Sequence, residues 1–542
     1  MSKADSQAAG ATGIVLATLA VGQFVMALDS TVMNTAIATV AHDVGTTVTG
    51  IQTAITMYTL VMASLMITGG KLGEILGRKR AFTIGCVVYA CGSFTTSISQ
   101  SLGVLMFGWS LLEGLGAVLI MPAIVALVAS NFGAPERPRA YGLIAAAGAI
   151  AAALGPVIGG AFTTYASWRW VFAGEVLIVF AILVLARRMK DTPSDEEVRL
   201  DIVGTALSAL GLGLAVFAIL RSGTWGLVQP KPGAPEWLGL SPSIWLLLVG
   251  AATLALFAAW ENRRMDRGQA VLIDLSMLRN LQLRSGVISF LFMFLVLAGT
   301  FFTVPLFLSI ALGLSAIETG VRLLPLSLSM LVFATLLPRL RPHASPRRVV
   351  RAGFLVVFAG LVLLVALLDV GSGAEIITWP MLLIGAGLGA MASQLGAATV
   401  SAVPDEQSGV VGGLQNTGSQ LGSSLGTALA GALLIAALTA SFFSGIENDP
   451  RVPDSVVSRA QTKLAGGVPF VSNEQLQSGL ADAGVPKNTA DAVVSDNEES
   501  RIDGLRVAIS GLALFALLGI VFTGNLPAAS AEANPAPRAV PV

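Results

Sequence analysis

Long apolar runs, separated by short segments rich in glycine, proline and charged residues, recur along the whole chain. A helix needs about 20 apolar residues to cross the roughly 30 Å hydrocarbon core of a bilayer, and most of these runs are long enough. Each run is predicted to be helical, because a lone strand in lipid would leave its backbone donors and acceptors unsatisfied. The fourteen runs cover residues 13–41, 52–70, 81–98, 103–130, 140–163, 170–187, 202–220, 243–261, 285–310, 319–338, 349–368, 377–400, 409–440 and 504–525.

Composition indicates that lipid is the solvent of this chain. Of its 542 residues, 54% are hydrophobic and only 12% are charged, which is more apolar than a water-soluble globule can bury. Lys plus Arg and Asp plus Glu both number 32, so the net charge indicates no nucleic-acid partner. Cys86 and Cys91, the only cysteines, share one apolar run and suit neither a disulfide framework nor a metal site. We therefore expect an all-α polytopic membrane protein.

Basic residues cluster in five of the six alternate connections between the runs, within residues 71–80, 137–139, 187–199, 263–284 and 339–351, and the sixth, after residue 400, holds none. Short connections rich in Lys and Arg remain on the cytoplasmic side of a membrane. A miscounted helix would scramble this alternation, so the charge pattern supports fourteen spans. We predict a multi-pass protein of the cell membrane with both termini in the cytoplasm.

The runs and their connections divide the chain into four parts. Residues 1–187 hold six runs, 188–284 form a linker with two inserted runs, 285–525 hold six more, and 526–542 form a cytoplasmic tail. The fifth run of each set of six is rich in glycine, a faint repetition that is typical of transporters with a site near the bilayer midplane. The acidic external loop 441–503 could attract cations or cap an exit, or it could be a solvated insertion.

The connection after the second run reads Gly70-Lys71-Leu72-Gly73-Glu74-Ile75-Leu76-Gly77-Arg78-Lys79-Arg80. Glycines permit a tight turn, and a carboxylate beside cations can make and break interhelical pairs as two halves of a protein move. The segment resembles the signature loop of the major facilitator superfamily. The resemblance implies a gating role for Gly70, Gly73, Glu74, Gly77 and Arg78, whereas the simpler alternative is a basic membrane anchor.

The fifth run contains Gly148, Gly155, Pro156, Gly159 and Gly160. A proline removes one helix hydrogen bond and kinks the helix, and glycines let neighbouring helices approach closely. The spacing is similar to the antiporter motif of the same superfamily at every fixed position. The resemblance implies a conformational hinge in an exporter, and the alternative is tight packing without any bearing on the direction of transport.

Asp29 and Asn34 lie in the first run, within Leu28-Asp29-Ser30-Thr31-Val32-Met33-Asn34-Thr35-Ala36-Ile37. A carboxylate inside a span is costly unless it is protonated, paired or hydrated, so Asp29 is predicted to bind a proton or a cation. The segment resembles an element of the fourteen-helix drug:proton antiporter family. The alternative is a structural carboxylate capped by hydroxyl groups such as that of Ser30.

The fourth run departs from this family at two positions. The resemblance leads us to expect an arginine at Ser110 and a glutamine at Glu113. At 1.5 Å per residue, Glu113 lies roughly 15 Å inside its span, near the bilayer middle. Without an arginine on this motif, Asp29 and Glu113 would repel each other if both were charged and close, so at least one should hold a proton. We therefore expect Glu113 to favour cationic substrates.

Further polar residues in the runs are candidates for a transport cavity. Glu175 follows Trp168-Arg169-Trp170 near a span end, so it lies either in the cavity or at the membrane interface. Gln394, Gln415 and Asn416 offer neutral hydrogen-bonding groups that suit a ligand, although tight helix packing explains them equally well.

The resemblance covers essentially the whole chain and implies a proton-coupled antiporter that exports hydrophobic, often cationic, compounds. No ATP-binding loop of the form G-x4-G-K-[ST] is present, so we expect neither an enzyme nor any cofactor, with protons as the coupling ion. The expected partners are small substrates, protons and lipid, with no nucleic acid, and the chain is expected to be a monomer. Two alternatives stay open: a dedicated exporter of one endogenous lipid, amino acid or antibiotic, and a non-transporting receptor.

Overall fold

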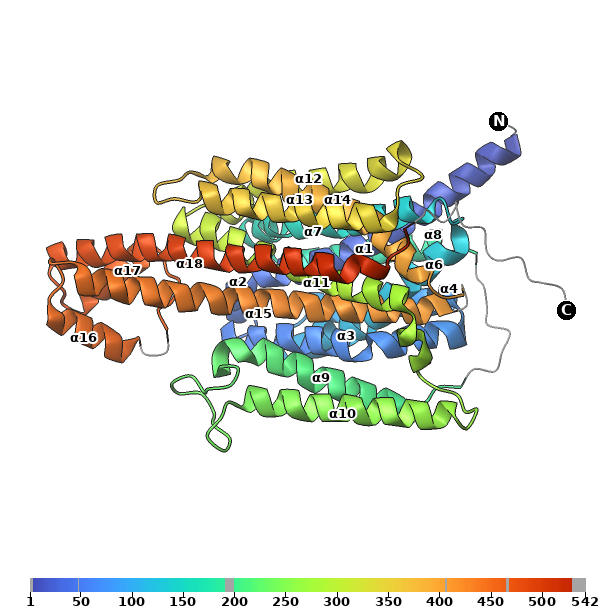
Figure 1. The fold of residues 1–542 in the computed structure, drawn as a ribbon, viewed down its shortest axis with the longest axis horizontal. Helices are drawn as coiled ribbons and strands as arrows, with labels where there is room; N and C mark the ends of the chain where they lie inside the picture. The colour runs from blue at the N-terminus through green and yellow to red at the C-terminus, as the bar shows by residue number, and fades with distance from the viewer. Residues whose placement is uncertain (1–2, 47, 191–198, 405–406, 465–466, 529–542) are drawn as a thin grey trace.

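The computed structural model describes residues 3–46, 48–190, 199–404, 407–464 and 467–528. Within these residues the regular structure is helical, and the single β-bridge joins Trp237 to Leu240. Most helices run side by side along the long axis of the molecule, and the two ends of the chain lie at the same end of the bundle (Figure 1). The all-α architecture predicted from the apolar runs is confirmed.

The first half of the chain forms a bundle from α1 to α8, followed by a helix pair. Its elements are α1 (Lys3–Thr35), α2 (Ile37–Asp43), α3 (Val48–Leu76), α4 (Arg78–Ser97), α5 (Leu102–Leu105), the π-helix η1 (Met106–Glu113), α6 (Gly114–Asn131), α7 (Arg137–Tyr165), α8 (Arg169–Ala186), α9 (Ile202–Trp225) and α10 (Pro242–Met265).

The second half forms the bundle from α11 to α18. Its elements are η2 (Leu275–Arg279), α11 (Leu281–Leu306), the π-helix η3 (Phe307–Ala311), α12 (Ala316–Leu340), α13 (Pro346–Leu367), η4 (Ala374–Ile377), α14 (Thr378–Val400), α15 (Ser408–Asn448), α16 (Asp454–Lys463), α17 (Asn473–Asp482), α18 (Lys487–Phe522) and η6 (Thr523–Asn525).

Thirteen helices in the described part of the chain are long and apolar enough to cross a membrane, and they coincide with thirteen of the fourteen predicted runs. The remaining run, 81–98, is α4, a helix of 20 residues that begins with three basic side chains. Its glycines pack on the fourth predicted span: a Cβ on Gly92 would lie 2.7 Å from the Gly108 carbonyl oxygen, and one on Gly85 would lie 2.9 Å from that of Gly116. This packing places α4 within the first bundle at the position expected for the remaining span, although α4 is less apolar than the other thirteen helices.

Two large clusters of buried apolar side chains correspond to the two bundles. One is drawn mainly from residues 15–189, and the other mainly from residues 293–526. In the pair α9 and α10, α9 packs against α3 (Figure 1), and the pair contributes Leu212 and Phe257 to the first cluster. The division into domains at 1–187, 188–284, 285–525 and 526–542 stays a prediction.

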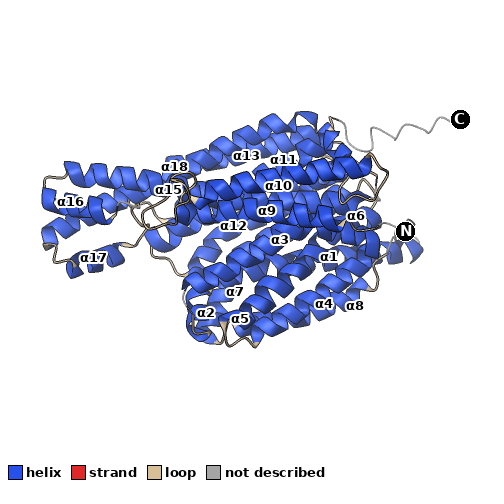
Figure 2. Cartoon of the chain, turned by 90° about the horizontal axis from the view of Figure 1, so that it is seen from below, coloured by secondary structure: helices blue, strands red, loops and turns tan. Residues whose placement is uncertain are grey.

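The segment predicted as an external loop, 441–503, contains long helical extensions. The 41 residues of α15 and the 36 of α18 correspond to about 60 Å and about 54 Å of helix, well beyond a bilayer core. Residues 441–448 and 487–503 therefore continue these helices. Together with α16 and α17 they project from the end opposite the termini (Figures 1 and 2), around a small apolar core that includes Phe442, Ile446 and Val493.

The two bundles meet through backbone contacts at glycines. Between α3 and α15, a Cβ on Gly70 would lie 2.5 Å from the Gly409 carbonyl oxygen. Between α7 and α12, a Cβ on Gly142 would lie 2.6 Å from the Ala334 carbonyl oxygen, and the Ser327 hydroxyl donates a hydrogen bond of 2.8 Å to the Ala149 carbonyl. Such close approaches require glycine, so any motion between the bundles must separate these surfaces.

We expect Gly155→Ala to loosen the packing of α7 on α1. The added Cβ would lie 2.2 Å from Thr31 Oγ1 and 2.4 Å from Thr31 Cβ, and such overpacking costs about 1–3 kcal/mol. Thermal unfolding in detergent should show a lower midpoint. Gly148→Ala on the same helix is the matched control, because its nearest contact, Gln23 Nε2, is 3.4 Å away. Equal midpoints for the two variants would contradict the prediction.

Candidate functional site

Three carboxyl groups from distant parts of the chain converge inside the first bundle. Asp29 comes from α1, Glu113 from the last residue of η1, and Glu175 from α8. None is more than 1% exposed, and one carboxylate oxygen from each lies within 4.8 Å of one from each of the others. The structure thus brings Asp29 and Glu113 together, and it places Glu175 beside them, buried inside the bundle.

Asp29 is approached by an aromatic pair. The Trp109 Nε1 hydrogen is donated to Asp29 Oδ1 over 2.6 Å, and the Trp109 ring stacks on Tyr58 with centroids 4.9 Å apart and an interplanar angle of 4°. Tyr58 and Trp109 are both buried. Sequence reasoning missed these two residues, although Trp109 lies one position before the expected arginine on the fourth run.

The two glutamates are held by hydroxyl groups of α4. Thr96 Oγ1 contacts Glu113 Oε1 at 3.0 Å, and the hydroxyls of Ser93 and Tyr89 donate to Glu175 Oε2 over 3.0 Å and 3.2 Å. The second oxygen of each carboxylate in the cluster, including Asp29 Oδ2, is buried without a hydrogen-bond partner. Hydroxyl groups can donate or accept, so they are compatible with either protonation state of the glutamates.

The local backbone explains why Glu113 points into the bundle. It ends the π-helical segment η1, and an extra residue in a helical turn changes the direction of the side chains that follow. Gly92 on α4 leaves room for it, because a Cβ there would lie 2.5 Å from Glu113 Cγ. Ser110, where the family resemblance leads one to expect arginine, is buried and donates to the Ala54 carbonyl over 2.8 Å.

Electrostatics limits the charge that this cluster can carry. No ion pair among the described residues links a basic side chain to Asp29, Glu113 or Glu175. Two charges 4.8 Å apart repel by about 3 kcal/mol at an effective dielectric constant of about 20, and each also loses its hydration. Protons or a bound cation must therefore compensate part of the charge. Among the described residues, these three carboxylates form the group that could provide ligand atoms for a metal ion.

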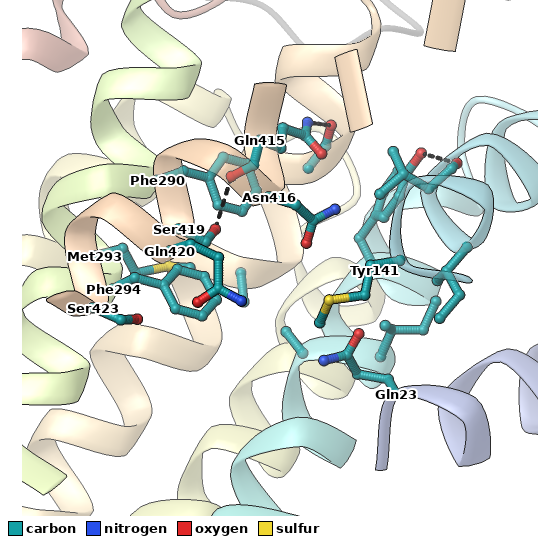
Figure 3. A pocket seen from close by; sticks show the side chains of 17 residues that line it. Gln23, Tyr141, Phe290, Met293, Phe294, Gln415, Asn416, Ser419, Gln420 and Ser423 are labelled. Atoms are coloured by element: carbon teal, nitrogen blue, oxygen red, sulfur yellow. Dashed lines mark hydrogen bonds between the residues drawn. The ribbon is translucent and has the colours of Figure 1, made fainter. Parts of the chain in front are cut away.

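A separate cavity of about 150 Å³ lies between the bundles (Figure 3). Gln23 of α1 lines one side, and Gln415, Asn416 and Gln420 of α15 line the other. The remaining lining residues are mostly apolar or aromatic: Met121, Ile124, Val125, Tyr141, Ile144, Ala145, Phe290, Met293, Phe294, Ala392, Gly396, Ser419 and Ser423. No charged side chain is among them.

Only part of the predicted lining reaches this cavity. Gln415 and Asn416 do, whereas Gln394 is buried on α14 outside the lining. Glu113 and Glu175 are also absent from the lining, so the acidic cluster and the cavity are distinct sites. The side chain of Asn34 lies outside the described residues.

Gln23 and the aromatic lining were missed from the sequence, where only the position of Gln23 six residues before Asp29 hinted at a role. In a helix, six residues correspond to about 9 Å along the axis. The first helix, α1, therefore connects the cluster to the cavity directly.

The residues of the predicted gating loop lie where α3 meets α15. Lys71 Nζ and Glu74 Oε2 form an ion pair of 3.0 Å within α3, and the Glu74 carboxylate also meets the backbone of Val410 on α15. A Cβ on Gly409, in the first turn of α15, would lie 3.7 Å from Glu74 Cγ. Gly77 has a φ of 91° and joins α3 to α4 through a conformation that favours glycine.

The remaining predicted gating residues show less direct roles in this conformation. A Cβ on Gly73 would make only an ordinary contact, 3.9 Å from Ala81 Cβ, and the Arg78 guanidinium lies 3.5 Å from the Ala126 carbonyl oxygen. On α7, the carbonyls of Gly159 and Gly160 accept hydrogen bonds from the Thr163 hydroxyl. The side chain of Pro156 lies outside the described residues.

Comparison with known proteins gives consistent matches. A family model described as Major Facilitator Superfamily matches residues 19–427. The "Probable actinorhodin transporter" of Streptomyces coelicolor is 31% identical over 454 residues, covering 81% of this chain and 74% of that protein. The "Tetracenomycin C resistance and export protein" of Streptomyces glaucescens is 30% identical and covers 75% and 73%. The "Multidrug resistance protein Stp" of Mycobacterium tuberculosis is 26% identical and covers 94% and 90%.

Solved structures share the fold at low sequence identity. The human organic anion transporter MFSD10 aligns with a TM-score of 0.58 at 13% identity, over 94% of this chain and 99% of that one. The proton:xylose symporter XylE aligns with a TM-score of 0.54 at 11% identity, over 97% and 99%. At these identities the likeness concerns the fold alone.

We expect Trp109→Phe to remove the hydrogen bond to Asp29 while keeping the aromatic stacking on Tyr58. A hydrogen bond to a charged group contributes about 1.5–3 kcal/mol, so the thermal unfolding midpoint in detergent should fall. The decisive measurement is a double-mutant cycle with Asp29→Asn. Trp109→Phe should lower the free energy of unfolding clearly less in the Asp29→Asn background than in the wild type. Trp379→Phe, at a ring that is 70% exposed, is the control and should have no effect. The same loss in both backgrounds would show that the bond to Asp29 is not what matters.

Proposed function

Because the chain belongs to the major facilitator superfamily and its relatives are named as exporters and resistance proteins, we propose that it is a proton-coupled antiporter that exports small hydrophobic compounds. Its family makes it a transporter and not an enzyme. The proposed finer assignment is a protein of the cell membrane that functions as a monomer with both termini in the cytoplasm. In that orientation the projection formed by α16 and α17 is external.

One observation carries the proposal: a buried carboxylate cluster without a basic partner is connected by α1 to a cavity between the two bundles. Buried ionisable groups in a membrane protein are costly and mark proton or ion pathways. A proton that binds Asp29 removes a negative charge at the Trp109 hydrogen bond. The resulting change at α1 reaches both Gln23 in the cavity and Thr31, which packs on Gly155. This continuity supports a coupling of proton binding to the arrangement of α1 and α7.

The cavity lining supports a substrate that is largely apolar and aromatic, with groups that can form hydrogen bonds. The rings of Phe290 and Phe294 are stacked with centroids 6.4 Å apart, and amide groups face the cavity from both bundles. Glu113 led us to expect a preference for cations, but it does not line the cavity. Any such preference must therefore come from aromatic faces and amide oxygens, which attract cations more weakly than a carboxylate does.

A second candidate is a dedicated exporter of a single antibiotic. The names of two relatives with about 30% identity refer to one compound each, actinorhodin and tetracenomycin C, whereas the name of a third refers to multidrug resistance. The two candidates differ in substrate breadth. No observation favours a non-transporting receptor.

We expect Asp29→Asn to abolish efflux that is driven by a pH gradient, because the change removes the titrating group and keeps its shape. The measurement uses proteoliposomes with an imposed pH gradient and a panel of cationic, neutral and anionic fluorescent dyes. Asp369→Asn, at an exposed residue, is the matched control and should transport like the wild type. Wild-type coupled efflux in Asp29→Asn would refute the proposed coupling, and transport of a single dye class would favour the dedicated exporter.

We expect Glu113→Gln to leave the ratio of cationic to neutral dye binding unchanged, because Glu113 lies outside the cavity. Phe294→Ala should instead weaken the binding of both dye classes by about tenfold, which corresponds to about 1.4 kcal/mol of lost aromatic contact. Equilibrium binding in detergent to the two variants provides the measurement. A selective loss of cation binding in Glu113→Gln would mean that Glu113 reaches the substrate after all.

A further inference from the structure

The hydrogen-bond donors around the acidic cluster distinguish its three carboxyl groups from one another. The titratable groups that face it are Asp29 of α1, Tyr58 of α3, Tyr89 of α4, Glu113 of η1 and Glu175 of α8. None of them is basic. The protonation of the cluster must therefore be compatible with the donors and acceptors that these elements provide.

Asp29 is the carboxyl group whose bonded partner can only donate, whereas the hydroxyl partners of the two glutamates can donate or accept. The indole nitrogen of Trp109 can only donate, so Asp29 Oδ1 must accept the bond of 2.6 Å. A distance this short is typical of a charged acceptor. The Tyr58 hydroxyl is buried without a bonded partner and faces Asp29, which offers a second donor. These contacts place the negative charge of the cluster on Asp29.

Glu113 meets a hydroxyl whose hydrogen already has an acceptor. Thr96 Oγ1 lies 2.9 Å from the Gly92 carbonyl oxygen and 3.0 Å from Glu113 Oε1, but it carries a single hydrogen. Threonine in a helix commonly donates to the carbonyl four residues earlier, which is Gly92 here. The contact with Glu113 is then a hydrogen bond only if Glu113 donates its own proton. With Glu113 protonated, the Gly92 carbonyl, the Thr96 hydroxyl and Glu113 Oε1 each have a hydrogen-bond partner.

Glu175 receives both of its donors on one oxygen. The hydroxyls of Ser93 and Tyr89 donate to Oε2, and Oε1 is buried without a partner. A proton on Oε1 makes this oxygen a donor toward the other carboxyl groups, whose unpartnered oxygens are also buried. Without that proton, a second negative charge would lie within about 5 Å of Asp29, and no ion pair with a basic side chain of the described residues would offset it.

We propose that the cluster holds two resident protons, on Glu113 and Glu175, and exchanges a single coupling proton, on Asp29. Uptake of that proton converts the Asp29 carboxylate to a carboxylic acid, and the cluster changes from one negative charge to none. Although the cluster contains three acidic groups, it exchanges one proton in each transport cycle. Glu113 and Glu175 are positioning residues, because their neutral carboxyl groups surround Asp29. The inference rests on the proposed function only in naming Asp29 as the coupling group.

Infrared difference spectroscopy of the purified full-length protein tests this proton inventory without any substrate. Protonated carboxyl groups absorb separately from carboxylates, and the variants Asp29→Asn, Glu113→Gln and Glu175→Gln assign each band. We expect Glu113→Gln and Glu175→Gln each to remove one protonated-carboxyl band that persists at neutral pH. Asp29→Asn should remove a band that appears only on acidification.

A further variant keeps the assignment testable if a glutamine variant fails to fold. Thr96→Val removes the acceptor of the Glu113 proton, so the Glu113 band should move to higher frequency without losing intensity. Spectra in which all three groups titrate together, or in which the glutamine variants lose no protonated band, would overturn the proposal. Loss of the resident bands on addition of Na⁺ or Ca²⁺ would also overturn it, because the cluster would then be a metal site.

Transport measurements separate this inference from the proposed function. If the resident protons are present, Glu113→Gln and Glu175→Gln mimic their neutral state, so the efflux that each variant retains, at whatever rate, should still be coupled to one proton per substrate, as determined from the reversal potential. A proton inventory that is confirmed in a protein without gradient-driven efflux would refute the proposed function alone. A reduced proton stoichiometry in either glutamine variant would refute the inference alone.

Discussion

Three carboxyl groups are buried together in the first bundle, and no basic side chain of the described residues neutralises them. Their mutual repulsion and lost hydration restrict the cluster to a small net charge. The surrounding elements are arranged to meet this restriction: an indole N–H and a phenol for Asp29, and α4 hydroxyls for the two glutamates. The π-helical η1 ends at Glu113, whose side chain points into the bundle, and Gly92 leaves room for that side chain. The hydrogen-bonding groups and the local backbone therefore both serve to accommodate the buried carboxyl groups.

The bundles themselves are held by a different kind of contact. Glycines at the α3–α15 and α7–α12 crossings bring backbones together, and a hydrogen bond from Ser327 to the Ala149 carbonyl fixes the relative orientation of α12 and α7. In lipid, helix association depends on close packing because apolar side chains gain little by leaving the solvent. Contacts of this kind have little polar bonding to break, so they suit surfaces that separate and rejoin during transport. One helix from each crossing, α15 and α7, also lines the cavity, so such separation changes the shape of the cavity.

The acidic cluster and the cavity occupy separate places, which determines how coupling can work. Gln23 and the α15 amides line the cavity, whereas Asp29 in the cluster meets Trp109 and Tyr58. The proposed coupling therefore does not rest on direct competition of proton and substrate for one carboxylate. Because α1 belongs to both sites and packs on Gly155 of α7, the proposal requires helix movement as the physical link between them.

The sequence by itself determined the helices and the family, and it singled out Asp29 as a carboxyl group within a span. Apolar length specifies a span in lipid whatever its neighbours are, and a carboxylate in such a span needs an explanation in any fold. Only the tertiary structure decided which residues meet. A sequence specifies the depth of Glu113 and Glu175 along their helices, but their direction depends on the rotation of each helix, the π-turn in η1 and the neighbours that α4 provides. For the same reason Gln23 lines the cavity, Gln394 does not, and the less apolar α4 takes its place inside the bundle.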